Sequence, residues 1–145
     1  MNIYNYLKKD HQTVANLFEQ ILSSKSTAKR KQLFEELINE LLLHSEAEND
    51  TFYAALESHN ETADLIEHAK KEHKEIKEYI KKLNALDIEK EKWIEQFGEF
   101  KHSVTHHVEE EEGNIFLRAK EVLSSTQANQ LAIDMEAMKQ ELKAA

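Results

Sequence analysis

The sequence contains no proline and no cysteine, and it has only two glycines among its 145 residues. Proline interrupts helices and glycine supplies the positive φ angles of tight turns, so their scarcity predicts long helices joined by few turns. Leu, Glu, Lys and Ala, which all favour helices, are abundant. Without cysteine the chain has neither disulfides nor thiolate metal sites, so any metal must be held by nitrogen and oxygen. We therefore expect an all-α fold in one domain, residues 1–145.

Long apolar runs and an excess of positive charge are also missing. No apolar stretch approaches the roughly 18–20 residues that span a bilayer, and the N-terminal segment lacks the basic-then-apolar order of a signal peptide. The formal charge of −9 would repel the phosphates of nucleic acid and of anionic membrane surfaces. We expect a cytoplasmic protein that binds neither nucleic acid nor membrane.

Apolar residues recur at helical spacing in four long stretches. These stretches cover about residues 2–24, 27–56, 62–87 and 88–123. Short connections favour antiparallel neighbours, so the sequence predicts an up-down-up-down four-helix bundle over about residues 2–123. A short amphipathic tail helix at about 126–143 is expected to lie across the bundle or one of its ends.

Local signals mark the helix starts and two unusual positions. Either Ser26 or Thr27 is suited to cap the second helix, and Thr62 the third. Gly98 and Gly113 lie inside the fourth stretch, where each costs roughly 1 kcal/mol relative to alanine. Close packing and a local bulge are the two explanations that we consider for them.

Polar residues continue the apolar stripe of two helices. In the second helix the stripe runs through His44 and Glu48, and in the fourth it runs through His107 and Glu111, at a constant offset of 63 residues. Residues four apart leave the same face of a helix, so each His–Glu pair is able to reach one point. The repeat predicts two equivalent His-x-x-x-Glu units facing the core.

The other two helices each add one histidine to this pattern. His11 and His73 occupy their stripes at an offset of 62 residues. Burying two carboxylates without partners would cost several kcal/mol each, and no Lys or Arg falls on the stripes at that depth. Four imidazoles and two carboxylates suit two first-row metal ions, each carboxylate being able to bridge them. The predicted metal ligands are His11, His44, Glu48, His73, His107 and Glu111.

Alternatives remain open at this stage. A bulge near Gly113 would let His106 and Glu110 replace His107 and Glu111. Otherwise His106 is expected on a solvated face, with a supporting role behind the ligands as the alternative, and His68 is expected at the surface. Any of the four tyrosines could offer a hydroxyl near the metals, but the sequence singles out none of them.

The polar residues together resemble a known family. The order Asp10-His11, His44-x-x-x-Glu48, Glu72-His73 and His107-x-x-x-Glu111 is similar to that of the hemerythrin-like HHE cation-binding domain family. The resemblance covers the four main helices. It implies a four-helix bundle with a non-haem di-iron centre, bridged by an oxo or hydroxo group, that serves in oxygen carriage, in sensing, or in handling peroxide and nitric oxide.

Two departures place the chain near one branch of that family. Ala69 stands where oxygen-carrying hemerythrins have a further histidine, and Glu111 ends a His-x-x-x-Glu motif in place of a His-x-x-x-x-Asp motif. Both features resemble the H–HxxxE–H–HxxxE branch. In this branch the two ions would be more alike, so reversible oxygen binding at one distinctive iron is less strongly implied.

The leading hypothesis is a di-iron binding protein that binds, senses or reacts with oxygen, nitric oxide or peroxide. The four histidines would be terminal ligands, and the two glutamates would bridge the irons. A carrier or sensor is favoured over a dedicated enzyme, because no acid or base beyond the ligands is evident. The alternatives are a peroxide-decomposing or nitric-oxide-handling enzyme, iron storage or delivery, and a metal-free helical module. No protein partner is indicated.

Overall fold

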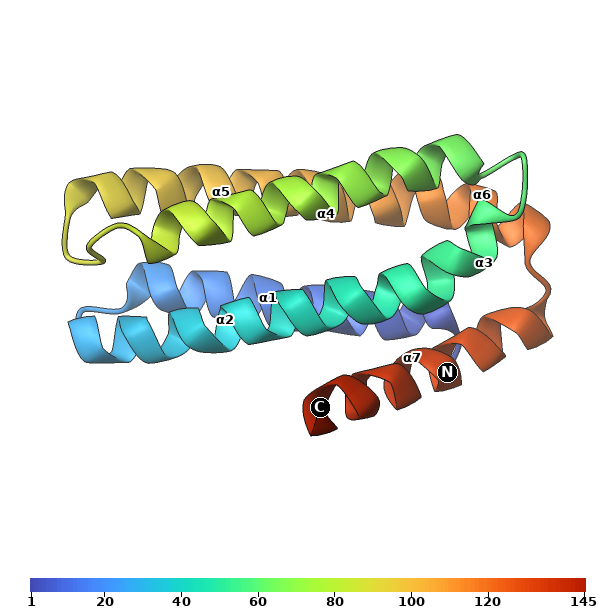
Figure 1. Cartoon of the computed structure of the whole chain (residues 1–145), viewed down its shortest axis with the longest axis horizontal. Helices are drawn as coiled ribbons and strands as arrows, with labels where there is room; N and C mark the ends of the chain where they lie inside the picture. Colours follow the sequence, from blue (N-terminus) through green and yellow to red (C-terminus); the bar gives the residue numbers. More distant parts are fainter.

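The computed structural model describes residues 1–145, and every regular element in it is a helix. Four long helical segments run antiparallel to one another in an up-down-up-down bundle, with the first two segments in one layer and the last two in the other (Figure 1). The all-α bundle predicted from the sequence is confirmed. The segments are α1 (Ile3–Ser23); α2 (Thr27–Glu48), continued by η1 (Asn49–Tyr53) and α3 (Ala54–Glu57); α4 (Ala63–Asn84); and α5 (Glu91–Glu110), continued by η2 (Glu111–Ile115) and α6 (Phe116–Val122).

Side-chain caps mark the starts of α1 and α2 but not that of α4. The Asn2 side chain accepts a hydrogen bond from the backbone N–H of Asn5, and Ser26, not Thr27, caps α2 in the same way. Thr62 occupies the cap position of α4 but does not cap it, because its hydroxyl donates to the Leu56 carbonyl at 2.6 Å. The turn between α4 and α5 is longer than expected, since α4 ends at Asn84 and α5 begins at Glu91.

Two π-helical turns, η1 and η2, interrupt the second and fourth segments at matching places. A π turn inserts one extra residue, so two consecutive side chains are able to face the core. Phe52 and Tyr53 are accordingly both fully buried, and Ile115 and Phe116 are almost completely buried. Gly113 lies within η2, which is the local bulge considered for it.

Close packing explains neither glycine. A Cβ atom added at Gly98 or at Gly113 would meet no other atom within 4 Å. Gly98 lies in regular α-helix, and nothing in the structure explains it.

The core consists of two apolar clusters separated along the bundle. One cluster gathers toward the end that holds the N-terminus and the connection from α6 to α7, and it includes Leu7 and Phe52; the other lies toward the opposite end and includes Val14 and Leu41 (Figure 1). Each cluster has 16 buried residues. The layer between them is where the polar residues of the stripes lie.

The tail helix α7 (Ser125–Ala144) has 20 residues, as many as α5. It begins with a capping box between Ser124 and Gln127. The tail helix predicted over about 126–143 is confirmed. It packs lengthwise against α1, α2 and η1, so the expectation that it lies across the bundle or one of its ends is wrong (Figure 1). The apolar face of α7 extends the first cluster through Ala128, Leu131 and Met135. Because this face runs along the helix, α7 buries it by lying alongside the bundle.

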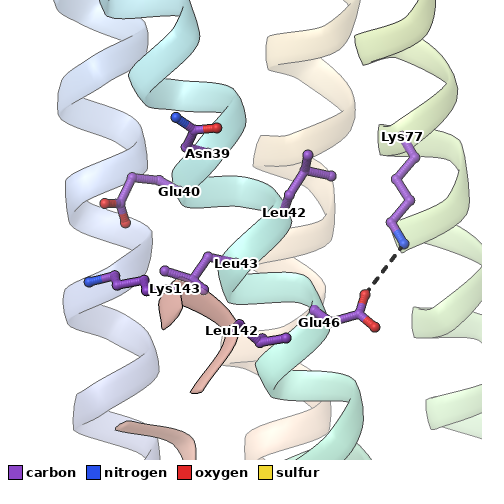
Figure 2. A pocket seen from close by; sticks show the side chains of 8 residues that line it. All are labelled: Asn39, Glu40, Leu42, Leu43, Glu46, Lys77, Leu142 and Lys143. Carbon is purple, nitrogen blue, oxygen red and sulfur yellow. Dashed lines mark ion pairs between the residues drawn. The ribbon is translucent and has the colours of Figure 1, made fainter. Parts of the chain in front are cut away.

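Five hollows on the outer surface are lined by none of the six predicted ligands. A hollow of about 700 Å³ lies outside α2, against the end of α7 (Figure 2). It is lined by Leu42, Leu43, Leu142, Lys143 and four polar residues of α2 and α4. None of the predicted ligands lines it. No helix is both long and apolar enough to cross a membrane.

Candidate metal centre

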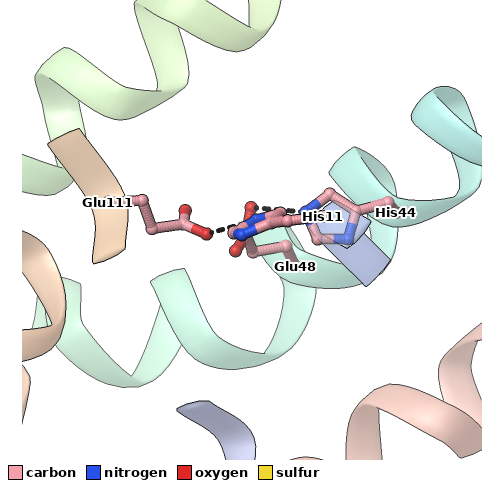
Figure 3. Close-up of side chains that lie close together, drawn as sticks. All are labelled: His11, His44, Glu48 and Glu111. Atoms are coloured by element: carbon pink, nitrogen blue, oxygen red, sulfur yellow. Dashed lines mark ion pairs between the residues drawn. The ribbon is translucent and has the colours of Figure 1, made fainter. Parts of the chain in front are cut away.

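All six predicted ligands lie in the layer between the two apolar clusters. Each of the four main segments contributes at least one of them, and all six are buried, with Glu48 and Glu111 fully so. Their ligand atoms form two groups, within each of which all the atoms are less than 4.8 Å apart. The first group is shown in Figure 3. The groups are His11, His44, Glu48 and Glu111, and then Glu48, His73 and His107.

The histidines therefore divide into two half-sites. We call His11 and His44 the first half-site, on α1 and α2, and His73 and His107 the second, on α4 and α5. The ring centroids are 5.2 Å apart in the first half-site and 4.7 Å apart in the second. Each half-site joins a lone histidine to the histidine of a His-x-x-x-Glu unit, as the internal repeat predicted.

Both glutamates lie between the half-sites. Oε1 of Glu48 is 3.4 Å from Nε2 of His44 and 3.2 Å from Nε2 of His73. Glu111 reaches the two half-sites through separate oxygens: Oε1 lies 3.0 Å from Nε2 of His11, and Oε2 lies 3.7 Å from Nε2 of His107. Each carboxylate thus faces one imidazole of each half-site, which is the arrangement of a bridging ligand.

The donor atoms fit metal ions better than they fit one another. Both oxygens of Glu48, Oε1 of Glu111 and Nε2 of His11 are buried without a hydrogen-bond partner, although such groups are normally satisfied. In the second half-site, Nε2 of His73 lies 3.1 Å from Nε2 of His107. Two nitrogens about 2.1 Å from one ion, at a right angle, would lie about 3.0 Å apart. A cation in each half-site would satisfy all of these atoms.

Carboxylates hold the outer nitrogens of two histidines. Nδ1 of His44 lies 2.7 Å from Oδ2 of Asp10, and Nδ1 of His107 lies 2.8 Å from Oε1 of Glu72. Asp10 and Glu72 directly precede the lone histidines His11 and His73. The two-fold repeat therefore includes the groups behind the ligands as well as the ligands themselves.

The lone histidines are held in the same way, but from the opposite pair of segments: His11 of α1 from η2, and His73 of α4 from η1. Nδ1 of His11 lies 2.6 Å from Oε2 of Glu112, and Nδ1 of His73 lies 2.9 Å from Oδ1 of Asn49. These partners directly follow Glu111 and Glu48 in the sequence. Because each Nδ1 has an acceptor, all four rings turn Nε2 inwards, as metal-binding histidines commonly do.

The charges around Glu48 favour an ionised carboxylate. Burial raises the pKa of Glu48, but the His44 and His73 imidazoles lower it, and the net result is a pKa well below the usual value. Burial lowers the pKa of His44, but the Glu48 carboxylate and the hydrogen bond with Asp10 raise it to about 10. The pKa of His73 is lowered, mainly by burial.

Tyr53 is a further polar group in the centre. Its hydroxyl donates a hydrogen bond to Oε2 of Glu111 and lies 3.4 Å from Nε2 of His107. Its ring stacks on that of His73, with 5.2 Å between the centroids. Burial and the charges of Glu111 and Glu48 raise the pKa of the Tyr53 hydroxyl well above its usual value. Its counterpart in the repeat is Phe116, which carries no hydroxyl.

Sequence reasoning did not single out Tyr53. A regular helix that turns Glu48 and Phe52 inwards would carry the next residue partly off the stripe. The π turn η1 brings Tyr53 back to the core. The signal that was available is the paired bulky residues at both repeat positions, Phe52-Tyr53 and Ile115-Phe116.

Comparisons with known proteins identify the family of this chain. The model of the hemerythrin HHE cation-binding domain matches residues 2–119. The chain belongs to this family. A solved HHE cation-binding domain-containing protein from Mycobacterium kansasii is 26% identical and superimposes with a TM-score of 0.89, over 99% of this chain and 88% of that one.

A second relative is a larger protein. A protein described as a DNA nickase, from Nostoc sp. strain PCC 7120, is 27% identical over 99% of this chain. The HHE domain described here spans only 40% of the length of that protein.

Within this HHE domain, His107 and Glu111 face the centre, whereas His106 and Glu110 do not. The side chain of His106 is 62% exposed. The bulge near Gly113 does form, but it begins only at Glu111, the last residue of the His-x-x-x-Glu unit, and so leaves the spacing within that unit unchanged. His106 nevertheless lies 3.7 Å from Glu72, the carboxylate behind His107, and His68 lies 3.5 Å from the same carboxylate.

Proposed function

We propose that this HHE domain holds two iron ions and that the pair binds, senses or reacts with a small ligand such as oxygen, nitric oxide or peroxide. His11 and His44 would bind one ion, His73 and His107 the other, and Glu48 and Glu111 would bridge them. The observation that carries the proposal is the position of the two buried glutamates, each between an imidazole of one half-site and an imidazole of the other.

The donor set leaves capacity for a ligand. Two imidazoles and two shared carboxylates give each ion fewer than the six donors that iron commonly takes, and nitrogen–oxygen sets of this kind suit iron. When bound, the iron pair supplies redox chemistry that the side chains lack. The protein contributes orientation through the four Nδ1 hydrogen bonds, and the two apolar clusters keep bulk water away.

The surroundings of the centre favour a small ligand. Leu7 and Phe52 on one side and Val14 and Leu41 on the other enclose the polar layer. The hollow of Figure 2 lies outside α2 and does not reach this layer. A diatomic molecule or hydrogen peroxide is able to pass between moving side chains, whereas a larger metabolite would need a permanent opening.

Metal analysis of purified variants tests the proposal. Protein made without a histidine tag should contain about two irons per chain and show near-ultraviolet absorption from oxygen-to-iron charge transfer. Glu111→Ala should lose most of this iron, because it removes a ligand from both half-sites. Glu109→Ala is the matched control, since Glu109 is exposed two residues earlier. Stoichiometric iron in Glu111→Ala would contradict the proposal.

Peroxide decomposition is the second candidate, favoured by Tyr53. The buried hydroxyl beside His107 and Glu111 gives the centre a proton-bearing group that is not itself one of the six predicted ligands. Disproportionation of two peroxide molecules into water and oxygen needs no external reductant. A catalytic role predicts that Tyr53→Phe slows oxygen evolution at unchanged iron content. Equal rates in the two proteins would leave the carrier or sensor as the better account.

DNA nicking is not favoured for this domain. The DNA nickase from Nostoc is mostly made of sequence that lies outside the matched region. The formal charge of −9 would oppose binding to a phosphate backbone.

A further inference from the structure

Lys139 on the tail helix is a buried lysine connected to a predicted ligand. It is only 7% exposed, and its ammonium lies 2.5 Å from Oδ2 of Asp10. The same oxygen of Asp10 lies 2.7 Å from Nδ1 of His44. Lysine is almost never buried unless it is paired, because removing its charge from water is costly. α7 is therefore hydrogen-bonded through Asp10 to the first half-site.

The contacts around Lys139 hold its ammonium in one place. It lies 4.8 Å from the centroid of the Tyr6 ring, a distance at which a cation is attracted to an aromatic face. The Tyr6 hydroxyl in turn donates to Glu136, one turn before Lys139 on α7, at 2.7 Å. Lys139 is thus fixed by two residues of α1 and by its own helix.

The second half-site has no equivalent of this lysine. Besides His107, Glu72, the counterpart of Asp10, is approached only by His68 and His106, which are both exposed, at 3.5 and 3.7 Å. α7 contacts the α1–α2 pair and has no counterpart beside α4 and α5 (Figure 1). A fixed positive charge behind the ligands therefore belongs to the first half-site alone.

A count of charges suggests what this lysine does. Two carboxylates, Asp10 and Glu112, stand behind the first half-site. One carboxylate, Glu72, and a neutral amide, Asn49, stand behind the second. With Lys139 included, the charge behind each half-site is −1; without it, the first half-site would carry one negative charge more than the second.

We propose that Lys139 is a positioning residue for His44, and that α7 uses it to offset the extra carboxylate behind the first half-site so that the two metal ions experience similar charge. This inference rests on the proposed two-metal function. A carboxylate that accepts from a ligating imidazole makes that imidazole a stronger donor to the metal. Lys139 shares the oxygen of Asp10 and so weakens this effect at His44 only.

Two neutral variants test the role of the charge. Lys139→Met keeps the length of the stem and loses the charge, whereas Lys139→Gln also keeps a hydrogen-bond donor. Lys143→Met is the matched control, because Lys143 lies one turn further along α7, exposed at the rim of the hollow in Figure 2, and makes no ion pair. Circular dichroism and thermal melts check that each variant folds.

The first readout is the proton NMR spectrum of protein loaded with Co²⁺. The Nδ1 protons of metal-bound imidazoles appear there as shifted, solvent-exchangeable resonances, and the one that Asp10→Asn moves most is assigned to His44. Both neutral variants of Lys139 should move this resonance and leave those of the other three histidines in place. A merely structural role for Lys139 would instead move all four resonances or none.

The second readout is the reduction potential of iron-loaded protein. Losing the positive charge should lower the potential of the iron in the first half-site, and the Lys143→Met potential should equal that of the wild type. Unchanged resonances and an unchanged potential in both neutral variants would overturn the inference while leaving the two-metal function intact. Wild-type protein that binds neither Co²⁺ nor iron would overturn the proposed function itself.

Discussion

Replacing Glu48 by glutamine should abolish most of the stabilisation that the protein gains from metal. Glutamine has nearly the same shape as glutamate, so packing at this fully buried position is preserved. The replacement removes a charged donor that lies 3.4 Å from Nε2 of His44 and 3.2 Å from Nε2 of His73. A single change therefore weakens both half-sites.

The size of the effect follows from ligand linkage. A metal present at 1,000 times its dissociation constant stabilises the folded state by about 4 kcal/mol. An unfolding entropy of about 2.1 cal/mol/K per residue gives a chain of 145 residues about 0.3 kcal/mol/K. Wild-type protein should therefore melt about 13 °C higher with metal than without it, and Glu48→Gln should gain only about 0–4 °C.

Differential scanning calorimetry with and without Co²⁺ measures this gain. Cobalt avoids the oxidation of iron during heating. Glu46→Gln is the control, because Glu46 lies on the exposed side of the same helix, where it is paired only with Lys77 at 3.8 Å. If cobalt raised the melting temperature of Glu48→Gln by as much as that of the wild type, the Glu48 carboxylate would contribute nothing to metal affinity, and the reasoning would be wrong.

Three further predictions concern the register, the pH and a glycine. His107→Ala should lose about half or more of the bound iron while His106→Ala keeps it, as elemental analysis would show; the opposite result would mean that the register of α5 differs. Burial lowers the pKa of His44, but the Glu48 carboxylate raises it, and the resulting pKa is about 10. An incoming metal ion must therefore displace a proton from His44. The affinity for Co²⁺ should rise about tenfold per pH unit between pH 7 and 9, as titrations would show. The same raised pKa stabilises the metal-free fold below the ordinary value of 6.5, and this contribution should fade as the pH approaches about 10; flat profiles of affinity and of melting temperature would contradict both statements. Gly98→Ala should raise the stability by about 0.5–1 kcal/mol in urea denaturation, because the added methyl group meets no atom within 4 Å, and a loss of stability would show that a close contact exists there.

The sequence by itself determined the helices and the six candidate ligands. Without proline, and with apolar residues at helical spacing, the chain has few alternatives to long helices. The His-x-x-x-Glu spacing places His44 and Glu48 on one face whatever the rest of the chain does, because residues four apart on a helix are always neighbours. This spacing depends only on local helix geometry, so it can be predicted from the sequence alone.

The register of the fourth helix was harder to predict. The sequence left His106 with Glu110 as an alternative to His107 with Glu111, because it shows that a bulge is plausible near Gly113 but not on which side of the glutamates it begins. The position of the π turn depends on how Ile115 and Phe116 pack against the first apolar cluster. Packing of that kind involves residues far away in the chain.

Only the tertiary structure decided what lies behind the ligands. Asp10 meets His44, and Glu72 meets His107, because antiparallel neighbours bring these positions to the same depth. Lys139 meets Asp10 across 129 positions of sequence, because α7 lies along α1 and α2. Propensity and periodicity describe a helix and its own faces. Which residue of a distant helix reaches a given nitrogen depends on how the helices pack, and that is a property of the whole chain.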